Sequence, residues 1–94
     1  MALLSDAEID ARLAEAGSWR RGERATIVSE HELPNFQQAL DYVNRVGALA
    51  EEANHHPDIL VHGWNKVSLT LSTHSEGGLT AADFDLAKRI EGLS

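Results

Sequence analysis

Apolar residues follow two different spacings along the chain. Apolar residues three or four positions apart, the helical spacing, occur in three stretches, at about 5–16, 34–50 and 80–93. Strand-like segments, bounded or divided by turn residues, occur in two regions, 19–33 and 58–73. The predicted order of elements is therefore α-β-β-α-β-β-α.

Local signals mark the ends of the predicted helices. Ser5 has Glu8 three residues later, which is the capping-box spacing, and Thr80 with Asp83 marks the start of the last helix. Pro57 disfavours helical backbone at the residue before it, so we expect the long helix that starts near Pro34 to end there. The apolar stripe predicted for that helix consists of Phe36, Leu40, Val43, Val46 or Gly47, and Ala50.

The predicted strands form two hairpins. Gly22 allows a tight turn in the first, and residues 62–65 connect the strands of the second. In the last strand Val67, Leu69 and Leu71 alternate with polar residues, so one face is expected to be buried and the other exposed to solvent. Residues 75–78 are predicted to form a flexible loop. The pattern indicates one α+β domain over 1–94, with a four-stranded antiparallel sheet and three helices packed on one face.

Composition narrows the possible functions. A net charge of -7 argues against direct nucleic-acid binding, which needs clustered Lys and Arg. With no cysteine there is no disulfide, thiolate zinc site or cysteine nucleophile. The first residues do not resemble a signal peptide, and no run approaches the ~18 apolar residues of a membrane span. We expect a cytoplasmic protein without a membrane partner. At 94 residues it has a small core, which favours association of several copies.

Histidines supply the candidate chemistry. His55 and His56 follow the predicted helix end, whose dipole favours imidazolium, and the ordinary histidine pKa of about 6.5 suits proton transfer at neutral pH. On a continuous helix Glu51 would share a face with His55, and Glu52 with His56. A carboxylate in that position is able to orient an imidazole, and the alternative for both glutamates is a solvated acidic patch. The alternative is that both histidines cap the last helix carbonyls. His74 ends the last strand beside a glycine-rich loop, where scaffolds often present catalytic groups, although a structural role is the alternative.

A metal site is the competing chemistry for the same residues. Three histidines and a carboxylate suit zinc or iron. Neighbouring histidines, however, diverge by about 100° around a helix, and the chain lacks recognisable metal spacings. We therefore expect no metal. His31 and His62 are interpreted as surface or partner contacts.

Several separated motifs match a known family. Residues 51–57, EEANHHP, are followed by WNKV at 64–67, LTLSTH at 69–74, GLT at 78–80 and Asp83. In order, spacing and residue type these motifs resemble the signature of the pterin-4a-carbinolamine dehydratases. The resemblance extends over the chain, with the first helix and residues 17–19 similar to the opening of that family.

The resemblance implies a reaction and a set of residues. The family removes water from 4a-hydroxytetrahydropterins to give quinonoid dihydropterins in tetrahydrobiopterin recycling, without metal or organic cofactor. The catalytic histidines carry over to His55, His56 and His74. We expect His55 and His74 to flank the 4a-hydroxyl as acid and base, and His56 to position the ring. The substrate-binding residues implied are Glu51, Pro57, Trp19, Ser72, Thr73 and Asp83. For Trp19, burial in the core is an equal alternative.

The resemblance also implies other roles. Family members form dimers and tetramers, so we expect a homodimer or homotetramer with a pterin substrate. Animal members act as dimerisation partners of a homeodomain transcription factor, and relatives in photosynthetic organisms assist carboxylase assembly. A non-catalytic protein-binding module of the same fold is therefore the main alternative, because fold does not fix function. A pterin-binding or metal-binding protein without turnover is a third possibility.

Overall fold

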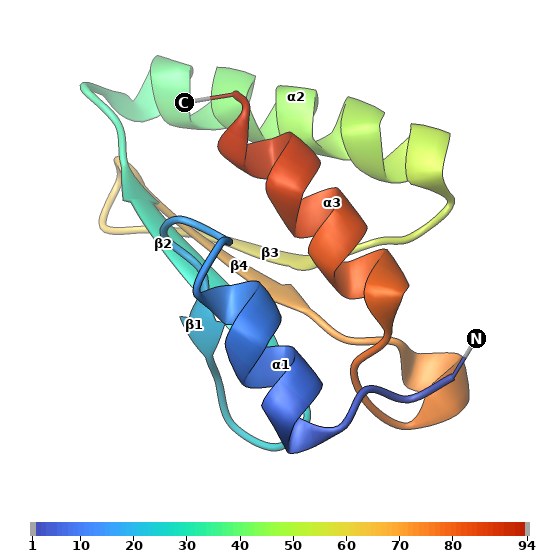
Figure 1. The fold of residues 1–94 in the computed structure, drawn as a ribbon. Coiled ribbons are helices and arrows are strands. Elements are labelled where there is room, and N and C mark those ends of the chain that lie inside the picture. Colours follow the sequence, from blue (N-terminus) through green and yellow to red (C-terminus); the bar gives the residue numbers. More distant parts are fainter. Residues whose placement is uncertain (1, 94) are drawn as a thin grey trace.

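The computed structural model describes residues 2–93 as an α+β fold with the predicted order of elements (Figure 1). The helices are α1 (Asp6–Leu13), α2 (Phe36–Ala53) and α3 (Ala81–Glu91), with a short 3₁₀ helix, η1 (His74–Glu76). The strands are β1 (Arg20–Arg21), β2 (Ile27–Glu32), β3 (Asp58–His62) and β4 (Lys66–Leu71). The predicted fold class is confirmed.

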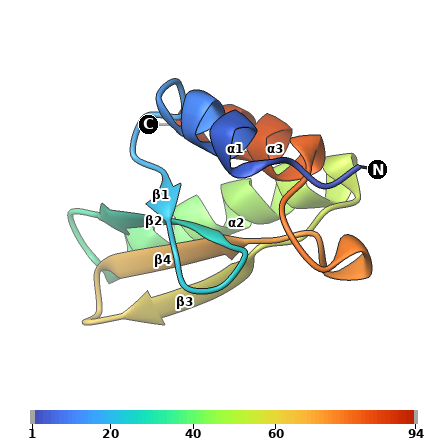
Figure 2. The same ribbon diagram turned by 60° about the horizontal axis from the view of Figure 1, so that its bottom comes forward.

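The four strands form one antiparallel sheet in the order β1-β2-β4-β3. The inner strand β4 pairs with β2, with Leu69 opposite Ser29, and with β3, with Leu69 opposite Ile59. Figure 2 shows the three helices on one side of this sheet and the other side without a helix. β3 therefore has a free edge, and half of each inner strand faces away from the helices.

The core lies between the sheet and the helices. Val67, Leu69 and Leu71 of β4 are fully buried, as the predicted alternation requires, while Ser68 and Thr70 between them remain partly exposed. Ile27 of β2 is also fully buried and lies opposite Leu71. Successive strand residues thus point alternately to the helices and to the helix-free face.

The capping signals are confirmed for α1 and α3. Both helices carry a complete capping box, from Ser5 with Glu8 and from Thr80 with Asp83. The predicted boundaries are less accurate. α1 ends at Leu13 rather than near Ala16, and α2 begins at Phe36 with Asn35 as its N-cap. The side chain of Asn35 accepts from the backbone N–H of Gln38 at 2.8 Å, whereas the side chain of Pro34 has no acceptor atom for this bond.

The buried face of α2 differs from the predicted stripe. Ala39, Tyr42, Val46 and Ala50 are its buried residues, and Val43 packs beside them. Phe36 is 51% exposed and Leu40 is 36% exposed. The stripe through Phe36 and Leu40 was wrong because Ala39 and Tyr42, seven and four residues before Val46, define the face that meets the sheet.

The predicted flexible loop is an ordered turn. Thr73 and Gly78 form an antiparallel bridge, in which the Thr73 N–H donates to the Gly78 carbonyl at 2.9 Å. Gly77 ends η1 with φ of 73°, a conformation that glycine adopts without a Cβ penalty. In the part of the chain that the structure describes, no helix is long and apolar enough to cross a membrane.

Candidate active site

His55, Thr73 and Asp83 meet where α2, β4 and α3 come together. His55 Nε2 lies 2.6 Å from Asp83 Oδ1, and Thr73 Oγ1 donates to Asp83 Oδ2 at 2.7 Å. The same Oδ2 accepts from the backbone N–H of Thr80 at 2.9 Å. Asp83 is fully buried, whereas the His55 side chain is 15% exposed. The arrangement joins a buried carboxylate to a histidine that reaches the surface.

The local sequence explains why the side chains of His55 and Asp83 lie close together. Asn54 ends α2 in the left-handed conformation, with φ of 50°, which asparagine tolerates better than most residues. The chain therefore turns before His55, whose N–H donates to the Ala50 carbonyl at 3.1 Å. Asp83 is the third residue of α3, so its capping position fixes the carboxylate toward the start of the helix.

The hydrogen bond fixes the tautomer of His55. An ionised carboxylate only accepts hydrogen bonds, so Nε2 of His55 carries the hydrogen that Asp83 receives. In the neutral ring Nδ1 is then the nitrogen with a free lone pair. Asp83 is thus a positioning residue, which leaves His55 able to exchange a proton through its other nitrogen.

His56 has a different partner from the one expected on a continuous helix. Its Nε2 contacts Oε2 of Glu51, so Glu51 is paired with His56 and not with His55. The left-handed Asn54 causes this change, because it ends the helical register before either histidine. His56 and Glu51 are both well exposed, whereas Glu52 pairs with Arg89 of α3 at 2.8 Å.

His74 follows the end of β4 and lines a cavity whose lining does not include His55 or Asp83. It begins η1 and is exposed, and the cavity has a volume of about 290 Å³. The other lining residues are Arg24, Ala25, Thr26, Ser72 and Gly77. Ser72 and Thr73 are consecutive, and Ser72 faces this cavity while Thr73 bonds to Asp83. The structure therefore groups His74 with Ser72, and His55 with Thr73 and Asp83.

Two other predicted site residues have different environments. Pro57 is partly buried directly after the two histidines. Trp19 is 3% exposed and belongs to the hydrophobic core, and its Nε1 has no hydrogen-bond partner. This burial is the one expected if Trp19 belongs to the core and not to the pterin-binding surface. Over residues 2–93 no group of three or more His, Asp or Glu side chains is arranged to hold a metal ion.

A second polar network was missed in the sequence because its residues are far apart. Ser18 donates to Glu91 of α3, Ser18 Oγ lies 2.7 Å from Ser29 Oγ, and Ser29 Oγ lies 2.8 Å from His31 Nε2. Each hydroxyl has one hydrogen, and that of Ser18 goes to Glu91. Ser29 must then donate to Ser18, and His31 Nε2 must donate to Ser29. His31 is therefore part of the fold and not a simple surface residue.

His31 is expected to make stability depend on pH. Burial lowers its pKa below the ordinary value, and Glu91 opposes this more weakly. The unfolded chain therefore binds more protons below about pH 6.5, and the free energy of unfolding decreases as pH falls from there through the lowered pKa. Urea unfolding at about pH 7.5 and about pH 5 should show a smaller decrease for His31→Gln than for the parent protein. Equal decreases in the two proteins would contradict this.

Comparison with known proteins decides the family. The sequence model of the family described as pterin 4 alpha carbinolamine dehydratase matches residues 2–93. The chain belongs to this family. A relative from Roseiflexus castenholzii, provisionally named a pterin-4-alpha-carbinolamine dehydratase, is 50% identical over 98% of this chain and 97% of its own length. A relative from Thermomicrobium roseum with the same provisional name is 45% identical over 100% of this chain and 99% of its own length.

Solved structures agree in fold. The crystal structure of a transcriptional coactivator/pterin dehydratase from Brucella melitensis is similar with a TM-score of 0.91 and 27% identity, covering 98% of both chains. A pterin dehydratase-like protein, described as a RuBisCO assembly factor in the alpha-carboxysome, is similar with a TM-score of 0.67 and 27% identity. That similarity covers 81% of this chain and 88% of the other. The fold is thus shared by proteins described with different functions.

Proposed function

We propose that this protein is a 4a-hydroxytetrahydropterin dehydratase that acts in the cytoplasm in tetrahydrobiopterin recycling. The observation that carries the proposal is the His55–Asp83 pair, in which a buried carboxylate orients a histidine that is still partly exposed. Membership of the dehydratase family supports a pterin as the substrate.

The reaction needs two proton transfers. The hydroxyl on C4a leaves as water after an acid protonates it, a base takes the proton from N5, and a C4a–N5 double bond forms. Positioned acids and bases typically contribute about 10² to 10⁴-fold each. We assign these roles to His55 and His74. His56, oriented by Glu51, positions the ring, and Pro57 and Ser72 shape its surroundings.

Thr73 and Asp83 contribute to substrate binding through His55. Both side chains are buried and hydrogen-bonded to each other. Their polar atoms are therefore less accessible to a ligand than those of a surface residue. Thr73 holds the second oxygen of Asp83 and thereby fixes the first oxygen toward His55. For Trp19 the buried position favours a role in the core over direct contact with the pterin.

One assay tests the proposed reaction. A 4a-hydroxytetrahydropterin is generated freshly, and its conversion to the quinonoid dihydropterin is followed by absorbance with and without the protein. We expect acceleration that a chelator leaves unchanged. Acceleration abolished by the chelator would favour a metal-dependent reaction instead, and no acceleration would favour a protein-binding function.

A non-catalytic binding role is the second candidate. It is supported by the two solved relatives, one described as a transcriptional coactivator/pterin dehydratase and the other as a RuBisCO assembly factor. Relatives with this fold carry both descriptions, so the fold does not distinguish a catalytic role from a binding role. The dehydration assay does.

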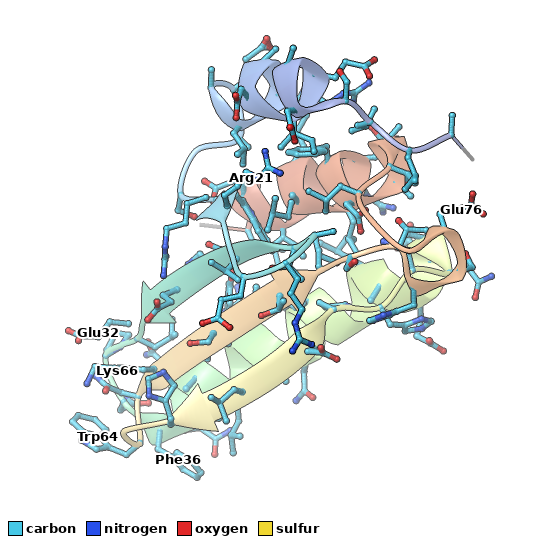
Figure 3. All side chains as sticks on the ribbon, turned by 90° about the horizontal axis from the view of Figure 1, so that it is seen from below. Arg21, Glu32, Phe36, Trp64, Lys66 and Glu76 are labelled. Atoms are coloured by element: carbon cyan, nitrogen blue, oxygen red, sulfur yellow. The ribbon has the colours of Figure 1, made fainter. Side chains whose placement is uncertain are left out.

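We further propose that copies of this chain associate into a dimer or tetramer. Leu60 is 58% exposed on the free-edge strand β3, and Trp64 is 62% exposed at the turn after it. Phe36 lies at the same end of the molecule as Trp64 (Figure 3). Exposed apolar side chains beside an unpaired strand edge favour pairing with another chain.

Sedimentation equilibrium tests this association. We expect a dimer or tetramer for the parent protein and a shift toward monomer for Leu60→Lys, which places a charge on the apolar edge. Leu3→Lys is the matched control, because Leu3 is 54% exposed but lies outside β3. A monomeric parent protein, or equal effects of the two variants, would contradict the proposal.

A further inference from the structure

The loop between β1 and β2 holds Arg24 in an unusual backbone conformation. Its φ of 58° lies in the left-handed region, which residues with a Cβ adopt at a cost. Three hydrogen bonds fix the loop. The Gly22 N–H donates to the Thr26 carbonyl at 3.0 Å, Thr26 Oγ1 donates to the Glu23 carbonyl at 2.6 Å, and Ser72 Oγ donates to the Ala25 carbonyl at 2.8 Å. Such conformations cluster at functional sites.

The charge of Arg24 is unpaired within residues 2–93, whereas its neighbours have partners. Arg20 pairs with Glu30 at 2.7 Å and Arg21 pairs with Asp6 at 3.2 Å. Arg24 is exposed and makes neither an ion pair nor a side-chain hydrogen bond in the described part of the chain. A guanidinium has five N–H donors arranged to bind a carboxylate or phosphate with two bonds at once.

Arg24 also stands at the boundary of two cavities. It lines the cavity of about 290 Å³ that contains His74 and Ser72. With Thr26 it also lines a second cavity of about 370 Å³, completed by Glu23, Val28 and Thr70. Val28 and Thr70 are paired across β2 and β4 and point to the helix-free face. A ligand that extends from His74 onto that face therefore passes Arg24.

We propose that Arg24 binds an anionic group on the C6 substituent of the pterin. The inference rests on the proposed dehydratase function, which places the reacting C4a–N5 bond beside His74. C6 is bonded to N5, so a substituent on C6 begins next to the reacting atoms and extends away from them. Its anion is a phosphate ester or a carboxylate, since the guanidinium suits both. Glu23, which lines the outer cavity, opposes the same anion.

Selectivity between substrates tests the role of Arg24. The three substrates are 4a-hydroxytetrahydropterins whose C6 substituent is a neutral dihydroxypropyl chain, its phosphate ester, or a chain ending in glutamate. We expect the parent protein to have a lower KM for one or both anionic substrates. In Arg24→Gln the ratio of neutral to anionic KM should fall about tenfold, because charge-assisted hydrogen bonds are lost. Comparing the phosphate ester with the substrate that ends in glutamate identifies which anion Arg24 binds.

Matched variants separate the effect of the Arg24 charge on selectivity from any effect on folding. Arg24→Lys should restore part of the selectivity, and Glu23→Gln should increase it by removing the opposing charge. Arg20→Gln is the control, since Arg20 lies in the same region but lines neither cavity. An unchanged ratio in Arg24→Gln, or equal changes for neutral and anionic substrates, would overturn the proposal.

Equilibrium binding keeps this test independent of turnover. The fluorescence of 6-carboxypterin and of 6-hydroxymethylpterin reports binding of a stable anionic and a stable neutral pterin. Tighter binding of 6-carboxypterin that Arg24→Gln abolishes would support the role of Arg24 even if the protein catalysed no dehydration. Preference for the neutral pterin, or equal binding of both, would overturn it.

Discussion

Asp83→Ala is expected to lower the free energy of unfolding by about 3–5 kcal/mol, because it removes the acceptor of several buried or partly buried donors, each of which costs about 1–3 kcal/mol when left unsatisfied. Asp83 is fully buried and accepts from His55, from the Thr73 hydroxyl and from the Thr80 N–H. Alanine leaves all three donors without this acceptor. Because small domains are stable by only about 5–15 kcal/mol, urea unfolding should show a large shift in midpoint.

Asp85→Ala is the matched control for Asp83→Ala. Asp85 lies on the same helix two residues later, is exposed, and makes no hydrogen bond or ion pair within the described residues. Its replacement should change stability by less than about 0.5 kcal/mol. Similar midpoints for the two variants would show that the Asp83 contacts contribute little to the fold.

Asp83→Asn separates the positioning role from stability. Asparagine retains the size and one acceptor oxygen, but its amide group presents N–H donors where the carboxylate had only acceptors. It therefore disfavours the His55 tautomer that donates from Nε2. We expect a folded variant with reduced dehydration and an altered pH profile, which a purely structural residue would leave unchanged.

His55→Ala and His74→Ala are each expected to reduce the dehydration rate by about 10² to 10⁴-fold, the usual contribution of a general acid or base. His55 is oriented by Asp83, and His74 is exposed in its cavity with Ser72. The two residues belong to different clusters, so each loss tests one side of the proposed site. Initial rates with freshly generated substrate measure both.

His62→Ala is the control for these variants. His62 ends β3 and bonds to Ser68 at 3.2 Å, outside both clusters. It should retain nearly the parent rate, and circular dichroism should show all three variants folded. Near-parental rates in both His55→Ala and His74→Ala would contradict the acid and base roles.

Much of the fold could be predicted because its signals are local. Capping residues such as Ser5 and Thr80 act within one turn of their own helix, and the alternation through Val67, Leu69 and Leu71 is a property of one strand. The predicted helix boundaries were less accurate where a residue that the pattern had not singled out caps a helix or begins a turn. Asn35 caps α2 in place of a start at Pro34, and η1 occupies a predicted flexible loop.

The apolar face of α2 shows why burial needs the tertiary structure. Phe36 and Leu40 fit helical spacing as well as Ala39 and Tyr42 do, and their side chains are more apolar than those of a small alanine and a tyrosine with a hydroxyl group. The sheet meets the other face, which leaves Phe36 51% exposed. Which of two overlapping stripes is buried depends on the orientation of the helix, and this is decided by packing.

By itself the sequence determined the order of elements, the caps of α1 and α3, and the candidate histidines. Only the tertiary structure decided their partners. The contact between His55 and Asp83 spans 28 residues, and Glu51 pairs with His56 because Asn54 turns the chain before the histidines. A side-chain contact over such a separation depends on how helices and strands pack, whereas a cap or an alternating strand depends only on neighbouring residues.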